Sequence, residues 1–422
     1  RGFSIFNTSG KVEYDSGNLL EHEAMRLGHY PEHRSASKGG EPEGAEVATY
    51  GRDRLMFIAA ERASLVFVFV DQGPGKAPRF LQALPTGTGP EGLLAIPSRN
   101  LFVAASEVDG AARAGVMLYE RGAKEPAYPT LVSSNSNGSA GLPIAWGAIS
   151  GISADRRQAE RFWAVTDSVY SQTRLLQIDT SKRPAMIAQA ITLTKEGKPA
   201  GYDAEGLAQR ADGSFWVASE GDPDNKAGAV PNLLLRVSAQ GEVQEEIRLP
   251  DELGKHATRF GLEGVTVTGE GATEAVWLAV QREWKDDPKG MVKILRFEPF
   301  SKTWGVLHYP LQAVSEPGAW VGLSEITAVG ADRFVVIERD NRFGDKAIKT
   351  LHTFSVSGLT PASLGSSQVP VVTKQLLRNL QPELQAPKGY VLDKVESFGI
   401  DTAGNAIAIT DNDGVDGGSN GE

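Results

Sequence analysis

Cysteine is absent from this sequence, histidine occurs only six times, and no apolar run approaches the length of a membrane span. Without cysteine, disulfides and thiolate metal sites are excluded. A spanning helix needs about 18 consecutive apolar residues, so the sequence predicts no transmembrane segment. The G-x-S-x-G, H-E-x-x-H and P-loop patterns are also missing. With no histidine inside the repeats described below, chemistry must come from carboxylates, arginine and lysine.

Acidic residues outnumber basic ones, 53 to 43, which gives a formal net charge of −10. Nucleic acids and anionic membranes attract basic surfaces, so neither is an expected partner. An acidic surface instead favours cations.

A short repeated segment organises the chain. Its clearest copy opens at residues 203–206 (DAEG), continues as an apolar strand, turns at Gly213 and returns as a second strand that ends at Glu220. This pattern is typical of a β-hairpin. We count seven copies, spaced by very roughly fifty to sixty residues, which open at 41–44, 89–92, 146–151, 203–206, 261–264, 322–325 and 394–397.

Repeats of this length, built from short strands without long amphipathic helices, are typical of β-propeller blades. We therefore predict an all-β fold, a seven-bladed β-propeller with four-stranded antiparallel blades around a central channel. One domain would span 1–422, with the first two blades and a closing strand near residues 2–6 in 1–130, and blades three to seven in 131–422. Trp163, Trp216 and Trp277 recur at equivalent strand positions, which favours packing between blades.

The acids of the repeats are predicted to converge at one rim of the channel, because a hairpin brings the start of its first strand beside the end of its second. Clustered carboxylates repel unless they are protonated, paired with arginine or neutralised by a cation. Ca²⁺ prefers such oxygen ligands, whereas the alternative is a set of ion pairs that align neighbouring blades. The candidate metal ligands are Glu43, Glu205, Glu220, Glu263, Glu325, Glu338, Asp411 and Asp413.

Basic residues fall on loops at the same predicted rim and could hold a phosphate or carboxylate. A metal-activated water would then need no protein nucleophile. Glu220 and Glu263 are the candidate catalytic residues. The candidate substrate-binding residues are Arg259, Arg282, Lys285, Arg339 and Arg342.

From about Trp146 onward, the segments 151–153, 162–167, 203–206, 261–264, 336–340 and 410–413 resemble the bacterial family called "esterase-like activity of phytase". The first 120 residues or so, through the segments 1–5, 15–17, 41–44 and 89–92, resemble the closing part of large secreted propeller proteins of the choice-of-anchor class, often described as alkaline-phosphatase-like. Together these resemblances imply a bacterial protein that is secreted, periplasmic or on the cell surface, with phosphoesterase or esterase activity. They also imply that more chain lies upstream of Arg1. Ser150 replaces the opening acid in the third repeat and breaks the symmetry of a metal ring.

Three functions are compatible with these residues. The first is a Ca²⁺-dependent, phytase-like hydrolase of a small phosphate ester or ester. The second is a non-catalytic extracellular propeller that binds a surface or protein partner through polar loops at 21–40 and 133–141. The third is a lactonase-like metal hydrolase.

Overall fold

The computed structural model describes residues 1–110, 113–122, 124–135, 141–225, 227–386, 388–392 and 394–415. It divides into two compact units. The first unit comprises Arg1–Ala148, Lys182–Ala188 and Asn412–Glu422, and the second comprises Ile149–Ser181 and Gln189–Asp411. Each unit is described separately, and a single propeller domain over 1–422 stays a prediction.

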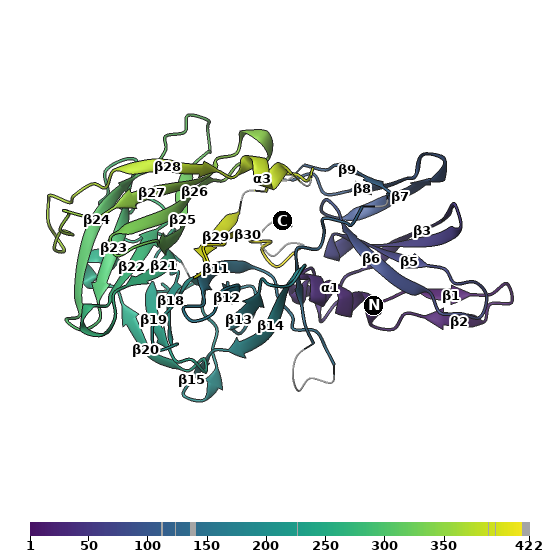
Figure 1. Cartoon of the computed structure of the whole chain (residues 1–422), viewed down its shortest axis with the longest axis horizontal. Coiled ribbons are helices and arrows are strands. Elements are labelled where there is room, and N and C mark those ends of the chain that lie inside the picture. Colours follow the sequence, from purple (N-terminus) through teal and green to yellow (C-terminus); the bar gives the residue numbers. More distant parts are fainter. Residues whose placement is uncertain are drawn as a thin grey trace. The chain divides into compact units, whose positions relative to one another are not determined.

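The first unit contains three antiparallel sheets and one longer helix (Figure 1). Its helix, α1 (Leu19–Leu27), buries Leu20, Ala24 and Leu27 at helical spacing, which corrects the expectation of a polar loop over 21–40. The sheets consist of β1 (Ser4–Phe6) and β2 (Val12–Asp15); of β3 (Pro42–Tyr50), β4 (Asp53–Ala60), β5 (Leu65–Val70) and β6 (Arg79–Pro85); and of β7 (Pro90–Ile96), β8 (Leu101–Ser106) and β9 (Val116–Glu120).

The N-terminal strand was predicted to close a ring with a C-terminal strand, but among the described residues β1 pairs only with β2, and Ser4 lies opposite Asp15. The short strand β10 (Leu131–Ser133) runs parallel to the first residues of β14 (Ala185–Thr192), a strand that begins in the first unit and ends in the second. The predicted polar loop at 133–141 lies partly outside the described residues, since 136–140 are not among them.

The second unit is built from successive antiparallel hairpins (Figure 1). Its strands are β11 (Ile149–Ala154), β12 (Arg161–Thr166), β13 (Arg174–Asp179), β14, β15 (Thr194–Lys195) and β16 (Lys198–Pro199), then β17 (Ala204–Gln209), β18 (Phe215–Ser219), β19 (Leu233–Val237) and β20 (Val243–Arg248), β21 (Leu262–Thr268), β22 (Ala275–Val280), β23 (Met291–Glu298) and β24 (Thr303–Pro310), β25 (Val321–Ala328), β26 (Arg333–Asp340), β27 (Lys349–Ser355) and β28 (Lys374–Asn379), and β29 (Val395–Ile400) with β30 (Ala406–Thr410). Two short helices, α2 (Asp251–Gly254) and α3 (Gln381–Gln385), lie in its loops. None of the helices in the described part of the chain is both long and apolar enough to cross a membrane.

The inner strands of the second unit form a closed cycle. β11, β17, β21, β25 and β29 are neighbours in that order, and β29 packs against β11. The hydroxyl of Ser397 on β29 donates to the carbonyl of Ser150 on β11 at 2.7 Å, and Ser324 on β25 donates to the carbonyl of Val395 at 2.8 Å. The structure is thus all-β and propeller-like, but it does not confirm seven blades, because five sheets already close on one another.

The repeated tryptophans pack between neighbouring sheets, which confirms their predicted role. Trp163, Trp216 and Trp277 are each at most 8% exposed. Their rings meet Phe215, Phe297 and Phe334 of the next sheet, at centroid distances of 5.2, 6.3 and 4.9 Å.

Near the ring centre, glycines allow neighbouring inner strands to approach closely. A Cβ added to Gly206 would lie 2.5 Å from the carbonyl oxygen of Glu263, and one added to Gly151 would lie 2.8 Å from the Cα of Gly206. Real Cβ contacts are never this short, so any side chain would push the strands apart.

We therefore expect Gly206→Ala to lower the free energy of unfolding by about 3 kcal/mol, the upper range for overpacking a rigid interior. Denaturant unfolding measures this change. Gly389→Ala is the control, because a Cβ there meets no atom within 4 Å. Equal stability of the two variants would contradict the close approach.

Candidate functional site

Each repeated hairpin places one residue out of register at its start. Ala204 pairs with Ser219 and Gly206 with Ala218, so Glu205 has no partner across the hairpin. Such a β-bulge redirects a side chain away from the regular alternation. The positions bulged in the same way are Glu43, Glu91, Ser150, Ser324 and Glu396, and in β21 the shift covers Glu263 and Gly264.

The end of the second strand brings another acid to the same place. Glu220 follows β18, and its N–H donates to the carbonyl of Asp203 at 2.7 Å. Carboxylate oxygens of Asp203, Glu205 and Glu220 all lie within 4.8 Å of one another. We call these three residues the acidic cluster, and their convergence agrees with the hairpin argument made from the sequence.

Two carboxyl groups of the acidic cluster, Glu205 and Glu220, have raised pKa values. Burial raises the pKa of Glu220 to about 8, with Asp203 and Glu396 adding to the rise and the Gly261 N–H, which donates to Glu220 at 2.6 Å, opposing it. Burial, then the charges of Glu263, Asp203 and Glu220, raise the pKa of Glu205 well above its usual range. Besides burial, acidic neighbours raise both pKa values, and too few basic groups lie nearby to offset them.

Glu263 lies next to the acidic cluster in the interior. It is 3% exposed and accepts a hydrogen bond from the Gln281 side-chain amide. Burial, then Glu396 and Glu220, raise the pKa of Glu263, whereas Arg339 opposes the rise. Glu283, which follows the second strand of the same hairpin, accepts the N–H of Gly290 at 2.9 Å.

Glu396, at the bulge of β29, joins the acids to a guanidinium. Arg339 Nη2 donates to Glu396 Oε1 at 2.6 Å. Glu396 is only 4% exposed, and its other oxygen, Oε2, has no hydrogen-bond partner among the described residues. A buried acceptor without a partner is rare, and a water or an ion at this oxygen would satisfy it.

Two predicted metal ligands of β25 and β26 lie elsewhere. Glu338 accepts the Tyr309 hydroxyl at 2.6 Å and the Gln312 N–H at 2.9 Å, and it pairs with Lys374. Glu325 is one residue past the bulge, where burial raises its pKa and the N–H groups of Ile326, Ile152 and Phe398 oppose the rise. The structure does not bring Glu338 to the acidic cluster, and Glu325 faces backbone at the ring centre.

The other predicted ligands are spread between the two units. Asp411, in the second unit, lies 3.7 Å from Lys394. Glu43 and Asp413 belong to the first unit, where Glu43 forms a separate acidic group with Glu41 and Glu61. In that group Arg34, Lys38 and Arg62 already pair with Glu41.

Three of the five predicted basic residues form one stack with two aromatic rings. The guanidinium carbons of Arg259 and Arg282 lie 4.6 and 4.4 Å from the Phe260 ring centroid. Those of Arg282 and Arg339 lie 4.8 and 5.3 Å from the Trp320 centroid. We call this the arginine–aromatic stack. Lys285 instead pairs with Asp224 at 3.0 Å, and Arg342 pairs with Asp340 and with Glu316.

Sequence reasoning did not assign Asp203, Gln281 or Lys394 to the site, and it placed Glu396 at the rim beside Asp411 without giving it a role. Asp203, Gln281 and Glu396 line up with predicted residues once the bulges fix the register, because Asp203 and Gln281 flank their hairpins and Glu396 matches Glu205. The signal in the sequence was therefore the repeat itself, aligned position by position.

These pKa shifts predict how stability depends on pH. The folded-state pKa of Glu220 is about 8, above its ordinary value of 4.5, so folding favours the protonated carboxyl. The contribution of protonated Glu220 to the free energy of unfolding is fully present below pH 4.5. It is lost as the pH rises toward 8, by at most about 1.4 kcal/mol per pH unit. Without divalent cations, the thermal midpoint should fall over this range.

Glu220→Gln should weaken that pH dependence, because the amide cannot lose a proton. Thermal unfolding in EDTA between pH 5 and 8 measures it. Glu245→Gln, a surface variant, should retain the full slope. If Glu220→Gln also retains it, the pKa of Glu220 is not raised.

Comparisons with known proteins were informative only at the level of families. No curated protein matches the chain. Among solved structures, a Lactobacillus plantarum protein is 12% identical with a TM-score of 0.32 and covers 82% of this chain and 84% of its own. Virginiamycin B lyase from Staphylococcus aureus is 12% identical, with a TM-score of 0.28 and coverage of 79% and 91%. The Dos1 propeller is 9% identical, with a TM-score of 0.31 and coverage of 74% and 64%. With TM-scores this low, none of these similarities supports a functional argument.

Family models match both parts of the sequence. The model "Choice-of-anchor I domain" matches residues 1–74. The model "Esterase-like activity of phytase" matches residues 144–414, which include the acidic cluster and the arginine–aromatic stack. The chain therefore belongs to the phytase-like family described as "esterase-like activity of phytase".

Proposed function

We propose that this protein is a divalent-cation-dependent hydrolase of phosphate esters or other esters, with Ca²⁺ as the first candidate ion, and that it acts at the acidic cluster of the second unit. The observation that carries the proposal is the convergence of Asp203, Glu205 and Glu220 within 4.8 Å, with no ion pair to any of them among the described residues. The family to which the chain belongs supports an esterase role. The choice-of-anchor match supports a secreted, periplasmic or cell-surface location.

The donor set of the acidic cluster fits a hard cation. Ca²⁺ binds carboxylate and carbonyl oxygens in flexible geometry, and the cluster offers carboxylates from Asp203, Glu205 and Glu220, with Glu263 beside them. The orphaned Oε2 of buried Glu396 adds a further acceptor nearby. The raised pKa values of Glu205 and Glu220 mean that, without a cation, protons neutralise these carboxylates near neutral pH. A bound divalent cation would neutralise them instead.

A divalent ion at this site would polarise the substrate ester and lower the pKa of water. Without the ion, burial raises the pKa of Glu220 to about 8. A bound divalent ion would lower that pKa and favour the carboxylate, so Glu220 could then hold the ion or accept a proton from water. Glu263 accepts a hydrogen bond from the Gln281 side chain, which orients its carboxyl group near Glu220. Arg339 is bound to Glu396, so it orients that carboxylate and is less available to a substrate than Arg282.

The proposal is tested by calorimetric titration of EDTA-stripped protein with Ca²⁺, followed by phosphate release from phytate and p-nitrophenyl phosphate with and without the ion. We expect near-stoichiometric binding and release that depends on the ion. Glu205→Gln and Glu220→Gln should each lower kcat/KM by about 100-fold or more while the protein remains folded. Glu245→Gln should keep full activity, because it lies on the outer strand β20.

Other outcomes point to other functions. Turnover of a lactone without phosphate release would favour a lactonase-like hydrolase. Ca²⁺ binding without turnover of any ester would favour a non-catalytic scaffold. Normal turnover in both Glu205→Gln and Glu220→Gln would exclude the acidic cluster as the reaction centre.

A further inference from the structure

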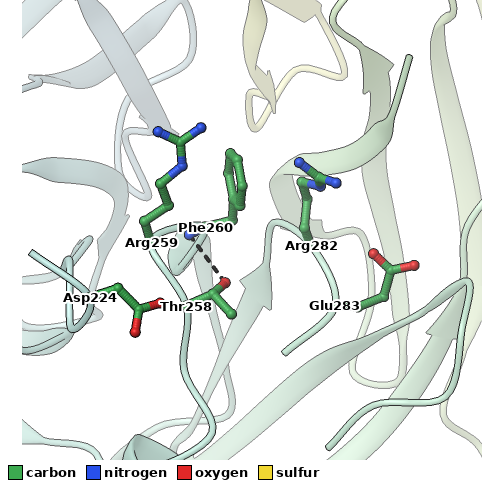
Figure 2. Close-up of a pocket in the computed structure, with 6 residues that line it drawn as sticks. All are labelled: Asp224, Thr258, Arg259, Phe260, Arg282 and Glu283. Carbon is green, nitrogen blue, oxygen red and sulfur yellow. Dashed lines mark hydrogen bonds between the residues drawn. The ribbon is translucent and has the colours of Figure 1, made fainter. Parts of the chain in front are cut away.

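A pocket of about 370 Å³ opens beside the arginine–aromatic stack (Figure 2). Figure 2 shows the Phe260 ring between the side chains of Arg259 and Arg282, and both guanidinium groups extend to the same side as the ring. The carboxylates of Asp224 and Glu283 lie on the other side of the pocket. Its lining residues are Asp224, Thr258, Arg259, Phe260, Arg282 and Glu283.

The aromatic rings leave only some of the arginine donors available. Arg282 lies over both Phe260 and Trp320, with its guanidinium carbon 4.4 and 4.8 Å from the ring centroids. Its N–H groups lie in the guanidinium plane and remain free to donate at the edges. An edge of this kind matches an acceptor with two oxygens side by side, such as a carboxylate or a phosphate.

The acids of the pocket do not neutralise these arginines. Asp224 accepts from Lys285 Nζ at 3.0 Å, and Glu283 accepts from the N–H of Gly290 at 2.9 Å. In the part of the chain that the structure describes, neither Arg259 nor Arg282 forms an ion pair with a carboxylate. Two guanidinium groups therefore flank one ring, and among the described residues no carboxylate forms an ion pair with either of them.

Other stacked arginines of this chain show that such pairing is the usual arrangement. Arg296 lies 5.5 Å from the Trp277 ring centroid and pairs with Glu298 at 2.7 Å. Arg210 lies 5.4 Å from the Trp216 centroid and pairs with Glu274 at 3.0 Å. Arg259 and Arg282 differ from these arginines because they lie over aromatic rings but form no ion pair with a carboxylate among the described residues.

The electrostatics of Arg282 agree with this geometry. Burial, together with the charge of Arg259, lowers the pKa of Arg282, while Glu283 opposes the change. Two cations that destabilise each other gain when an anion binds between them, because the anion relieves their repulsion as well as forming hydrogen bonds.

We propose that the pocket at Arg259, Phe260 and Arg282 is a subsite for an oxyanion group, a carboxylate or a phosphate, on a part of the substrate that is not hydrolysed. The role in turnover rests on the proposed function, but the binding itself does not. The proposal narrows the substrate class to esters that carry a second anionic group.

The subsite is tested by calorimetric titration of the EDTA-stripped protein at low salt, with inorganic phosphate in one arm and malonate in the other. Binding of either probe is expected, and the stronger arm identifies the preferred group. Arg282→Gln and Arg259→Gln should each weaken binding about tenfold, equivalent to about 1.4 kcal/mol. Arg259 is exposed, so its replacement keeps the test valid if Arg282→Gln disturbs the packing.

Arg296→Gln is the matched control, because Arg296 is also stacked on an indole but already paired with Glu298. It should leave anion binding unchanged. Failure of both probes to bind, or equal weakening in Arg296→Gln, would overturn the subsite.

The subsite and the proposed hydrolase can fail independently. Glu220→Gln should retain anion binding in EDTA, because Glu220 forms no hydrogen bond or ion pair with Arg259 or Arg282 in the described structure. If a hydrolysed substrate is found, Arg259→Gln should raise KM for the ester with a second anionic group and leave KM for its neutral analogue unchanged. Equal effects on both esters would overturn the role of the pocket in selecting substrates.

Discussion

The close approach of neighbouring inner strands is the constraint on which the site of the second unit depends. A Cβ on Gly206 would lie 2.5 Å from the carbonyl oxygen of Glu263, and a Cβ on Gly151 would lie 2.8 Å from the Cα of Gly206, so neither position has room for a side chain. Immediately before this contact the hairpin bulges, so the preceding residue cannot follow the ordinary alternation. Backbone packing therefore directs Glu205 toward the ring interior, where it adds a charge that the fold does not compensate.

Charge around the ring is asymmetric because neighbouring sheets carry different residues at equivalent positions. In each hairpin, the position one residue past the pair that precedes the bulge holds Asp167, Glu220 or Asp411 in three sheets, and Gln281 or Arg339 in the two between. An acidic side and a basic side result within one ring. A substrate that places its ester near a bound cation and a second, anionic group near a guanidinium fits this arrangement better than it would fit a symmetric ring of acids.

The sequence was sufficient to predict the hairpins, the approach of Glu205 and Glu220 in one of them and the packing of the repeated tryptophans. It could not predict closure among five sheets, because closure depends on contacts such as Ser397 with Ser150 that no local pattern encodes. Residue assignments failed where the register mattered. Side chains alternate along a strand, so a shift of one position exchanges Glu338 for Arg339 at the site. The bulge at Ser324 likewise moves Glu325 out of the acid positions.

The aromatic stack also explains how the acidic and basic sides can influence each other. Trp320 lies between Arg282 and Arg339, and Arg339 holds Glu396, whose charge raises the pKa values of Glu220 and Glu263. An anion at Arg282 and a cation at the acidic cluster attract each other, and each also relieves repulsion within its own group. Binding of one should therefore favour binding of the other, and thermodynamic linkage requires the effect to be reciprocal. A substrate that supplies the anion would then promote loading of the cation that hydrolysis needs.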